Sequence, residues 1–268
     1  MTDVNFWNQF FVWPIINLLM VFYKAFEVIH VPGSLGFAVI ALTITIRLLL
    51  YPLTRAQLRS AKQMAGLKPH LDVLTTRHKG DKPALQKAQM DLYKEHGVNP
   101  AAGCLPLLIQ MPVLIALYNV FYQVLQNGNM EKLVTDINQV VYHQALRLQS
   151  FDLNFFGVSL GLKPSSWQTD GWWLLTIPVI TAALQFWQSK LMMPPTKPSV
   201  ISHQLSDKKS LKKDEVKVDT AAEMQKQMMM ITPIMFGMFA FQFPLGLSLY
   251  WNVFGLFGIM QQLRVNKE

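Results

Sequence analysis

Cysteines are nearly absent from this sequence, and so are the short motifs of common enzyme families. Cys104 is the only cysteine among 268 residues, which excludes an intramolecular disulfide and a metal site built from several cysteines. The HExxH, GxSxG and P-loop motifs are missing, and the six histidines are scattered along the chain. We therefore expect no catalytic residue, no metal and no cofactor, and a protein that is not an enzyme.

Long apolar segments dominate what is present. Apolar residues make up 51% of the chain and charged residues 15%, a balance that favours a membrane protein. Several segments approach the ~20 residues that a helix needs to cross a ~30 Å hydrocarbon core. We predict an all-α membrane protein with five transmembrane helices, at residues 34–53, 103–125, 172–191, 227–243 and 247–263. Only a Phe243 and Pro244 break separates the last two, which predicts a tight helical hairpin.

The segments expected on the outer side are less uniform. Within residues 1–33, residues 5–29 are aromatic and apolar but are interrupted by polar side chains. We interpret them as an amphipathic helix at the membrane interface, with a sixth membrane span as the alternative. Residues 126–171 form a predicted extracytoplasmic loop, with a short helix near 131–148 and an apolar FFGVSLGL patch expected at the membrane surface.

Basic residues are concentrated in two connecting segments. Residues 54–98 carry nine Lys or Arg and residues 190–226 carry eight, whereas residues 126–171 carry three. The positive-inside rule then predicts an external N-terminus and a cytoplasmic C-terminal tail at residues 264–268. This distribution explains the net charge of +8 better than nucleic-acid binding does, so we expect no DNA partner, with ribosomal RNA as one candidate contact.

The two basic segments differ in their expected structure. Residues 54–99 predict a cytoplasmic helical hairpin, in which Asp81 caps the second helix, Pro83 lies in its first turn and Gly97 ends it. Residues 192–226 mix proline, serine and alternating charges with little apolar periodicity, which predicts a mobile cytoplasmic loop.

Arg47 is a charged residue inside the first apolar segment. Such a charge costs at least ~2.5 kcal/mol in hydrocarbon, and none of the five predicted spans contains an Asp or Glu that could pair with it. The arginine either snorkels to the cytoplasmic headgroups or faces a water-filled recess open to the cytoplasm. Polar residues at similar depth favour the recess, although each could instead form an ordinary interhelical hydrogen bond: Thr43, Gln110, Gln185 and Gln188.

The last two predicted spans are rich in methionine and aromatic residues. Met235 and Met238 either pack against lipid or form an adaptable surface that accepts varied apolar segments. Tyr250 and Trp251 either line the same path or belong to an interfacial aromatic belt.

Three segments of the sequence resemble the YidC, Oxa and Alb family of membrane protein insertases: TITIRLLLYPLTRAQ, KEHGVNPAAGCLPLLIQMPVLIALY and FPLGLSLYWNVFGLFGIMQQ. The resemblance covers essentially the whole chain, in order, including the basic hairpin. It implies five helices around a hydrophilic groove that is open to the cytoplasm and to lipid but closed to the outside. It also implies a bacterial cytoplasmic (inner) membrane protein, of the type without a large extracytoplasmic domain.

The same resemblance implies roles for particular residues. Arg47 matches the groove arginine of the family, Thr43 and Trp251 match groove positions that contact nascent chains, and Gln185 or Gln188 adds a polar lining. Gln110 is placed in the groove by its depth alone.

The implied function is that of an insertase or chaperone. Short hydrophilic segments of nascent membrane proteins would move through the groove, and apolar segments would pass along Met235, Met238 and Tyr250 into the phospholipid bilayer. The ribosome and the Sec translocon are candidate partners. The alternative is a small-solute channel or transporter with a polar vestibule, which the lack of repeat symmetry and of intramembrane acids disfavours.

Overall fold

The computed structural model describes residues 2–78, 80–98, 105–127, 130–192 and 220–267. Its helices are η1 (Asn8–Val12), α1 (Trp13–Val28), α2 (Ser34–Leu49), α3 (Tyr51–Gly66), α4 (Lys68–Arg77), α5 (Lys82–Glu95), α6 (Leu105–Asn127), α7 (Met130–Val140), α8 (Trp167–Asp170), α9 (Thr176–Met192), α11 (Thr220–Gln242) and α12 (Leu245–Lys267). Short 3-10 turns η3 (Gln144–Leu146), η4 (Pro164–Ser166) and η5 (Trp172–Leu175) lie between them.

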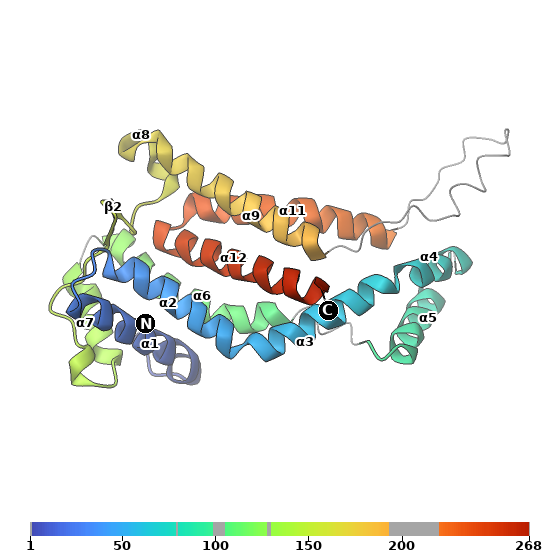
Figure 1. Ribbon diagram of the computed structural model, residues 1–268, viewed down its shortest axis with the longest axis horizontal. Helices are drawn as coiled ribbons and strands as arrows, with labels where there is room; N and C mark the ends of the chain where they lie inside the picture. The colour runs from blue at the N-terminus through green and yellow to red at the C-terminus, as the bar shows by residue number, and fades with distance from the viewer. Residues whose placement is uncertain (1, 79, 99–104, 128–129, 193–219, 268) are drawn as a thin grey trace.

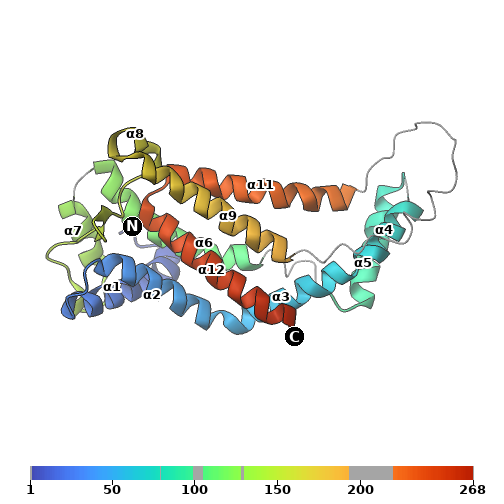
Figure 2. The same ribbon diagram turned by 45° about the horizontal axis from the view of Figure 1, so that its top comes forward.

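The long helices form one elongated bundle. Helix α12 packs against both α2 and α9, while α9 also packs along α11, and α1 lies against α2. Figures 1 and 2 show α1 and α7 at one end of this bundle, with α4 and α5 at the opposite end beyond α3. The buried apolar core lies among α1, α2, α6, α7 and α12. Helix α12 is therefore the central element on which the others are assembled.

The five membrane spans stay a prediction from the sequence, because only some of the corresponding helices are long and apolar enough to cross a membrane. Within the described ranges, Asn8–Val28 is the one helix long and apolar enough to cross a membrane by itself. The pair α2 and α3 would supply a second, but it is bent by 63°. The helical segments Met111–Tyr122 and Met230–Gln242 are apolar but shorter. The choice between an interfacial helix and a sixth span for residues 5–29 also stays open.

The bend between α2 and α3 shortens the first predicted span. We expected one helix through residue 53, whereas α2 ends at Leu49. Pro52 lies in the first turn of α3; it has no N–H to donate to the Leu48 carbonyl, and its ring would collide with that carbonyl in a continuous helix. The chain therefore changes direction just beyond the turn that carries Arg47.

Local signals for helix ends are confirmed. The Asp81 side chain accepts a 3.0 Å hydrogen bond from the Ala84 amide at the start of α5, and Pro83 lies in its first turn. Gly97 follows the helix with φ of +64°, a conformation that glycine adopts without steric cost. Helices α11 and α12 are separated only by Phe243 and Pro244, as predicted. The predicted mobile loop lies outside the described residues over 193–219, and α11 already begins at Thr220.

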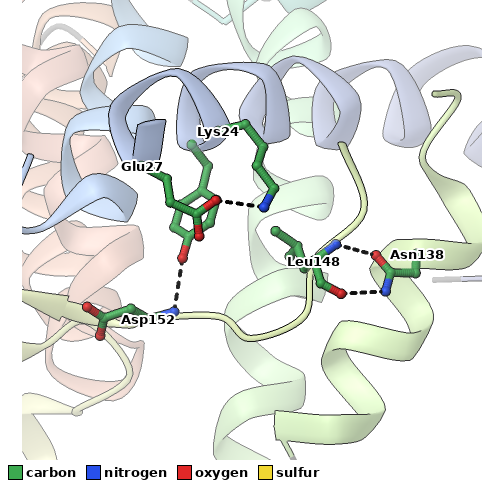
Figure 3. Close-up of polar contacts among 6 residues, drawn as sticks. Lys24, Glu27, Asn138, Leu148 and Asp152 are labelled. Carbon is green, nitrogen blue, oxygen red and sulfur yellow. Dashed lines mark hydrogen bonds and ion pairs between the residues drawn. The ribbon is translucent and has the colours of Figure 1, made fainter. Parts of the chain in front are cut away.

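The predicted extracytoplasmic loop departs from the all-α expectation. Strands β1 (Asn154–Phe155) and β2 (Val158–Ser159) form a small antiparallel hairpin. Helix α7 ends at Val140 rather than near residue 148. The Asn138 amide then bonds both the N–H and the carbonyl of Leu148, at 2.8 and 2.9 Å, and holds the following loop closed (Figure 3). The backbone of the segment after α7 is therefore held in place by a side chain of that helix.

The hairpin packs against a surface of α2 made of glycines. A Cβ placed on Gly36 would lie 2.1 Å from the Phe155 ring, which leaves no space for a side chain. We expect Gly36→Ala to destabilise the protein by about 1–3 kcal/mol, because the overpacked ring must move. Gly66→Ala in α3 is the matched control; a Cβ there has no described atom within 4 Å, so stability should rise by up to about 1 kcal/mol. Thermal unfolding in detergent measures both variants, and equal shifts would contradict the packing argument.

Candidate functional site

Arg47 lies near the end of α2, and its guanidinium is held by α12. Its side chain is buried, with 5% of the residue exposed. One terminal nitrogen donates a 2.9 Å hydrogen bond to Gln261 Oε1, and the other donates a 2.6 Å bond to the Phe254 carbonyl. The guanidinium carbon also lies 3.4 Å from the centre of the Phe254 ring, within the range of a cation–π interaction. The charge therefore lies inside the bundle rather than at its surface.

The partners of Arg47 are neutral. The two hydrogen-bond acceptors are an amide side chain and a backbone carbonyl, whereas Lys24 forms an ion pair with Glu27 within α1 (Figure 3). The Nε atom of Arg47 is buried and has no hydrogen-bond partner among the described residues. Arg47 thus keeps its positive charge and some of its donor capacity.

At Gly258 of α12, a third helix, α9, comes close to Arg47. A Cβ on Gly258 would lie 2.5 Å from Gln188 Nε2 and 2.9 Å from a terminal nitrogen of Arg47. The missing side chain lets α9 and α2 place polar groups against one position of α12. We refer to Arg47, Gln188, Gly258 and Gln261 as the polar seam.

The other residues expected in the groove are placed differently. Thr43 is fully buried and its hydroxyl donates to the Val39 carbonyl of the preceding turn at 2.6 Å. Gln185 and Gln188 are half-buried on α9. Gln110 belongs to α6, but its side chain lies outside the described set. The structure therefore brings Arg47 and Gln188 together, while Thr43 lies one turn away on α2.

Trp251 lies in a cluster of aromatic rings. The centres of the Phe236 and Phe243 rings are each 5.7 Å from it, and that of Phe239 is 6.3 Å away. The indole N–H is buried without a hydrogen-bond partner among the described residues, which is costly unless water or a ligand binds it. Trp251 is thus a large apolar contact with one polar group still available.

The proposed apolar path is divided between the surface and the interior. Met235 and Met238 on α11 are 40% and 64% exposed. Tyr250 is fully buried, with its ring 5.8 Å from that of Phe254. The two methionines can contact lipid or an apolar segment directly, whereas Tyr250 supports the Phe254 ring that covers Arg47.

Polar residues of α12 were missed by the sequence interpretation. Gln261, Gln262 and Ser248 are buried, and both Ser248 Oγ and Gln262 Oε1 lack partners among the described residues. Ser248, Trp251, Gly258 and Gln262 recur at spacings that place them on one side of a helix. The sequence shows this periodicity, but it does not show which helices pack against this side of α12. The site is thus a helical-bundle interior with buried polar groups and a cation whose hydrogen-bond acceptors are neutral.

Comparison with known proteins identifies the family. The family described as 60Kd inner membrane protein matches residues 25–268. The resemblance to the YidC, Oxa and Alb insertases is confirmed, and the chain belongs to this family of inner membrane proteins.

Individual relatives agree with this assignment. The chain is 31% identical to "Membrane protein insertase YidC" of Neisseria gonorrhoeae, over 89% of this chain and 34% of the relative. It is 34% identical to the protein of the same name in Shewanella halifaxensis, over 93% of this chain and 35% of that one. "Inner membrane ALBINO3-like protein 1, chloroplastic" of Chlamydomonas reinhardtii is 31% identical, over 88% and 44%. The chain thus spans less than half the length of these relatives, and they give the channel alternative no support.

A solved structure shares the fold. The structure described as "Active YidC insertase crystal structure with the first transmembrane domain resolved" aligns with a TM-score of 0.53 at 21% identity. The alignment covers 96% of this chain and 46% of the other.

Proposed function

We propose that the chain is a membrane protein insertase or chaperone, which passes short hydrophilic segments of nascent membrane proteins through a polar groove. The observation that carries the proposal is Arg47, a buried cation held by neutral groups of α12. A polar segment crossing hydrocarbon loses its hydration at a cost of several kcal/mol, about 2–7 for each unpaired amide or hydroxyl. Donors and acceptors of the polar seam would lower that cost by replacing water.

The apolar part of the client would leave along a different surface. Met235 and Met238 are exposed on α11 and can adapt to side chains of many shapes. We propose that the client's apolar segment passes along them into the phospholipid bilayer. Tyr250 would not contact the client, and would instead support the Phe254 ring that packs on Arg47.

We further propose the orientation that the basic segments predict. The N-terminus would lie outside a bacterial inner membrane and the C-terminus in the cytoplasm, with five spans around the groove. Helices α3, α4 and α5 would then meet a client first, at the cytoplasmic end of the bundle. The ribosome and the Sec translocon remain candidate partners, and the chemistry requires no nucleotide hydrolysis.

Site-specific crosslinking tests the groove directly. A photocrosslinker at Thr43 or at Trp251 is expected to capture a single-span client stalled during insertion, because both positions lie in the proposed path. The matched controls are Leu49 on α2 and Leu256 on α12, which are 70% and 48% exposed on the outside of the same helices. Each variant must first sustain growth of an insertase-depleted bacterium. Capture only from Leu49 and Leu256 would exclude the groove.

A further inference from the structure

Gln261 of α12 accepts a hydrogen bond from Arg47 through its side chain. It is buried, with 6% of the residue exposed, and its Oε1 accepts from Arg47 across 214 positions of sequence. The next residue, Gln262, is equally buried but donates instead to Asn266 within α12 at 3.0 Å. Two adjacent amides of the same type therefore have different partners, and one of them is the arginine.

The chemistry of this contact leaves the arginine available. A guanidinium binds carboxylates in a bidentate arrangement, with hydrogen bonds roughly twice as strong as neutral ones. Gln261 offers one neutral oxygen, and the Phe254 carbonyl offers another. These acceptors fix the position of the guanidinium but leave its charge uncompensated. A client carboxylate that reaches the seam can displace the amide oxygen, whereas it could not readily displace a resident carboxylate.

We propose that Gln261 is a positioning residue that occupies the acceptor site of the client on Arg47 and thereby sets the preference for acidic hydrophilic segments. This inference rests on the proposed insertase function. A neutral amide at position 261 lets an acidic client gain an ion pair, in exchange for one neutral hydrogen bond. An acid at the same position would supply that ion pair permanently and remove the gain.

Gly258 supports this arrangement from the adjacent turn. Because it lacks a side chain, Gln188 and Arg47 can both approach α12 at that point. Gln188 Nε2 and a terminal nitrogen of Arg47 lie 2.5 and 2.9 Å from the same Cβ position, so a carboxylate that reaches Arg47 would also lie near the Gln188 amide. The exchange can therefore occur without leaving every polar group in the seam unpaired.

The test compares Gln261→Glu with Leu263→Glu in the full chain. Two single-span clients that differ only by Asp or Asn in the hydrophilic segment are inserted, and the acidic-to-neutral ratio is measured. Gln261→Glu is expected to lower this ratio by about tenfold, the size of one hydrogen bond to a charged group. Leu263→Glu adds a carboxylate two positions away, at a residue that is 42% exposed, and should change the ratio by less than about twofold. Equal effects of both variants would overturn the proposal.

A second variant gives an answer that does not require a buried acid. Gln261→Met keeps the length of the side chain and removes the competing acceptor, so the acidic-to-neutral ratio should rise. An unchanged or lowered ratio would overturn the proposal. Crosslinking of the neutral client from Thr43 separates the two hypotheses. If the neutral client is still captured from Thr43 while substitutions of Gln261 leave the acidic-to-neutral ratio unchanged, the groove proposal is supported and the role of Gln261 is wrong. If the unmodified chain does not capture the client, the groove proposal itself is wrong.

Discussion

Replacing Arg47 with glutamate is expected to abolish most insertion of clients with acidic hydrophilic segments, and to impair neutral clients less. A carboxylate at this position would face Gln261 Oε1 and the Phe254 carbonyl, both of which are acceptors. An uncompensated buried charge costs about 3–5 kcal/mol, and the reversed charge would also repel an acidic client. Arg47→Lys should retain much of the activity, because an ammonium group can still donate to one of these oxygens.

Insertion assays in a depleted strain, with the acidic and neutral clients measured side by side, test this expectation. Arg47→Ala separates loss of the charge from its reversal, and should affect the acidic client most. Lys190→Glu is the control for net charge, since Lys190 is an exposed basic residue at the end of α9. Equal insertion by every Arg47 variant would assign the arginine a structural or snorkelling role.

Arg47 could be identified from the sequence because its signal is local. A single charge within an apolar segment, without an acid in any predicted span, is visible without knowing how helices pack. Gln261 could not be identified in the same way. Its role depends on which face of α12 meets α2, and that contact joins residues 214 positions apart. The position of a residue along a helix can be counted in the sequence, whereas the residue that it contacts on a neighbouring helix cannot be derived from the sequence in this way.

The same distinction explains the fold predictions. The Asp81 cap and the Phe243 and Pro244 break are determined by neighbouring residues, and both were predicted. The early end of α7 was not predicted, because the group that takes over its last carbonyl is Asn17, on α1. The bend before α3 had a local signal in Pro52, but the apolar composition of the segment concealed it.

The β-hairpin lacked the usual sequence signal. Its two turn residues, Phe156 and Gly157, both have positive φ, at 50° and 85°. Such a turn normally favours Asn followed by Gly, and a phenylalanine in the left-handed region costs about 1–2 kcal/mol. The packing of Phe155 against Gly36 of α2 and against Gly33, the residue before α2, stabilises this conformation from outside the hairpin. This stabilising contact between the hairpin and α2 is visible only in the tertiary structure.

Replacing Asn17 with alanine is expected to detach α1 from the loop that follows α7. The Asn17 amide donates to the Trp13 and Val140 carbonyls, both at 2.9 Å, and accepts a 2.7 Å bond from the Tyr142 amide. Truncation leaves the buried Val140 carbonyl without that partner, while the N–H of Tyr142, a residue 64% exposed, can bind water instead. A buried unsatisfied group costs about 1–3 kcal/mol, so we expect a loss of about 2 kcal/mol. Amide hydrogen exchange along α1, together with thermal unfolding in detergent, measures this change.

Asn138→Ala is the matched comparison, because it removes hydrogen bonds of the same kind that close only a ten-residue loop (Figure 3). It should loosen residues 141–148 while α1 keeps its protection from exchange. Asn17→Ala should expose both α1 and the loop, since its bonds join segments 123 and 125 positions apart. Because α1 also packs on α2, the helix that carries Arg47, its release would reach the polar seam. If both variants expose α1 equally, packing around Tyr23 and Phe151, rather than the Asn17 bonds, holds the N-terminal helix in place.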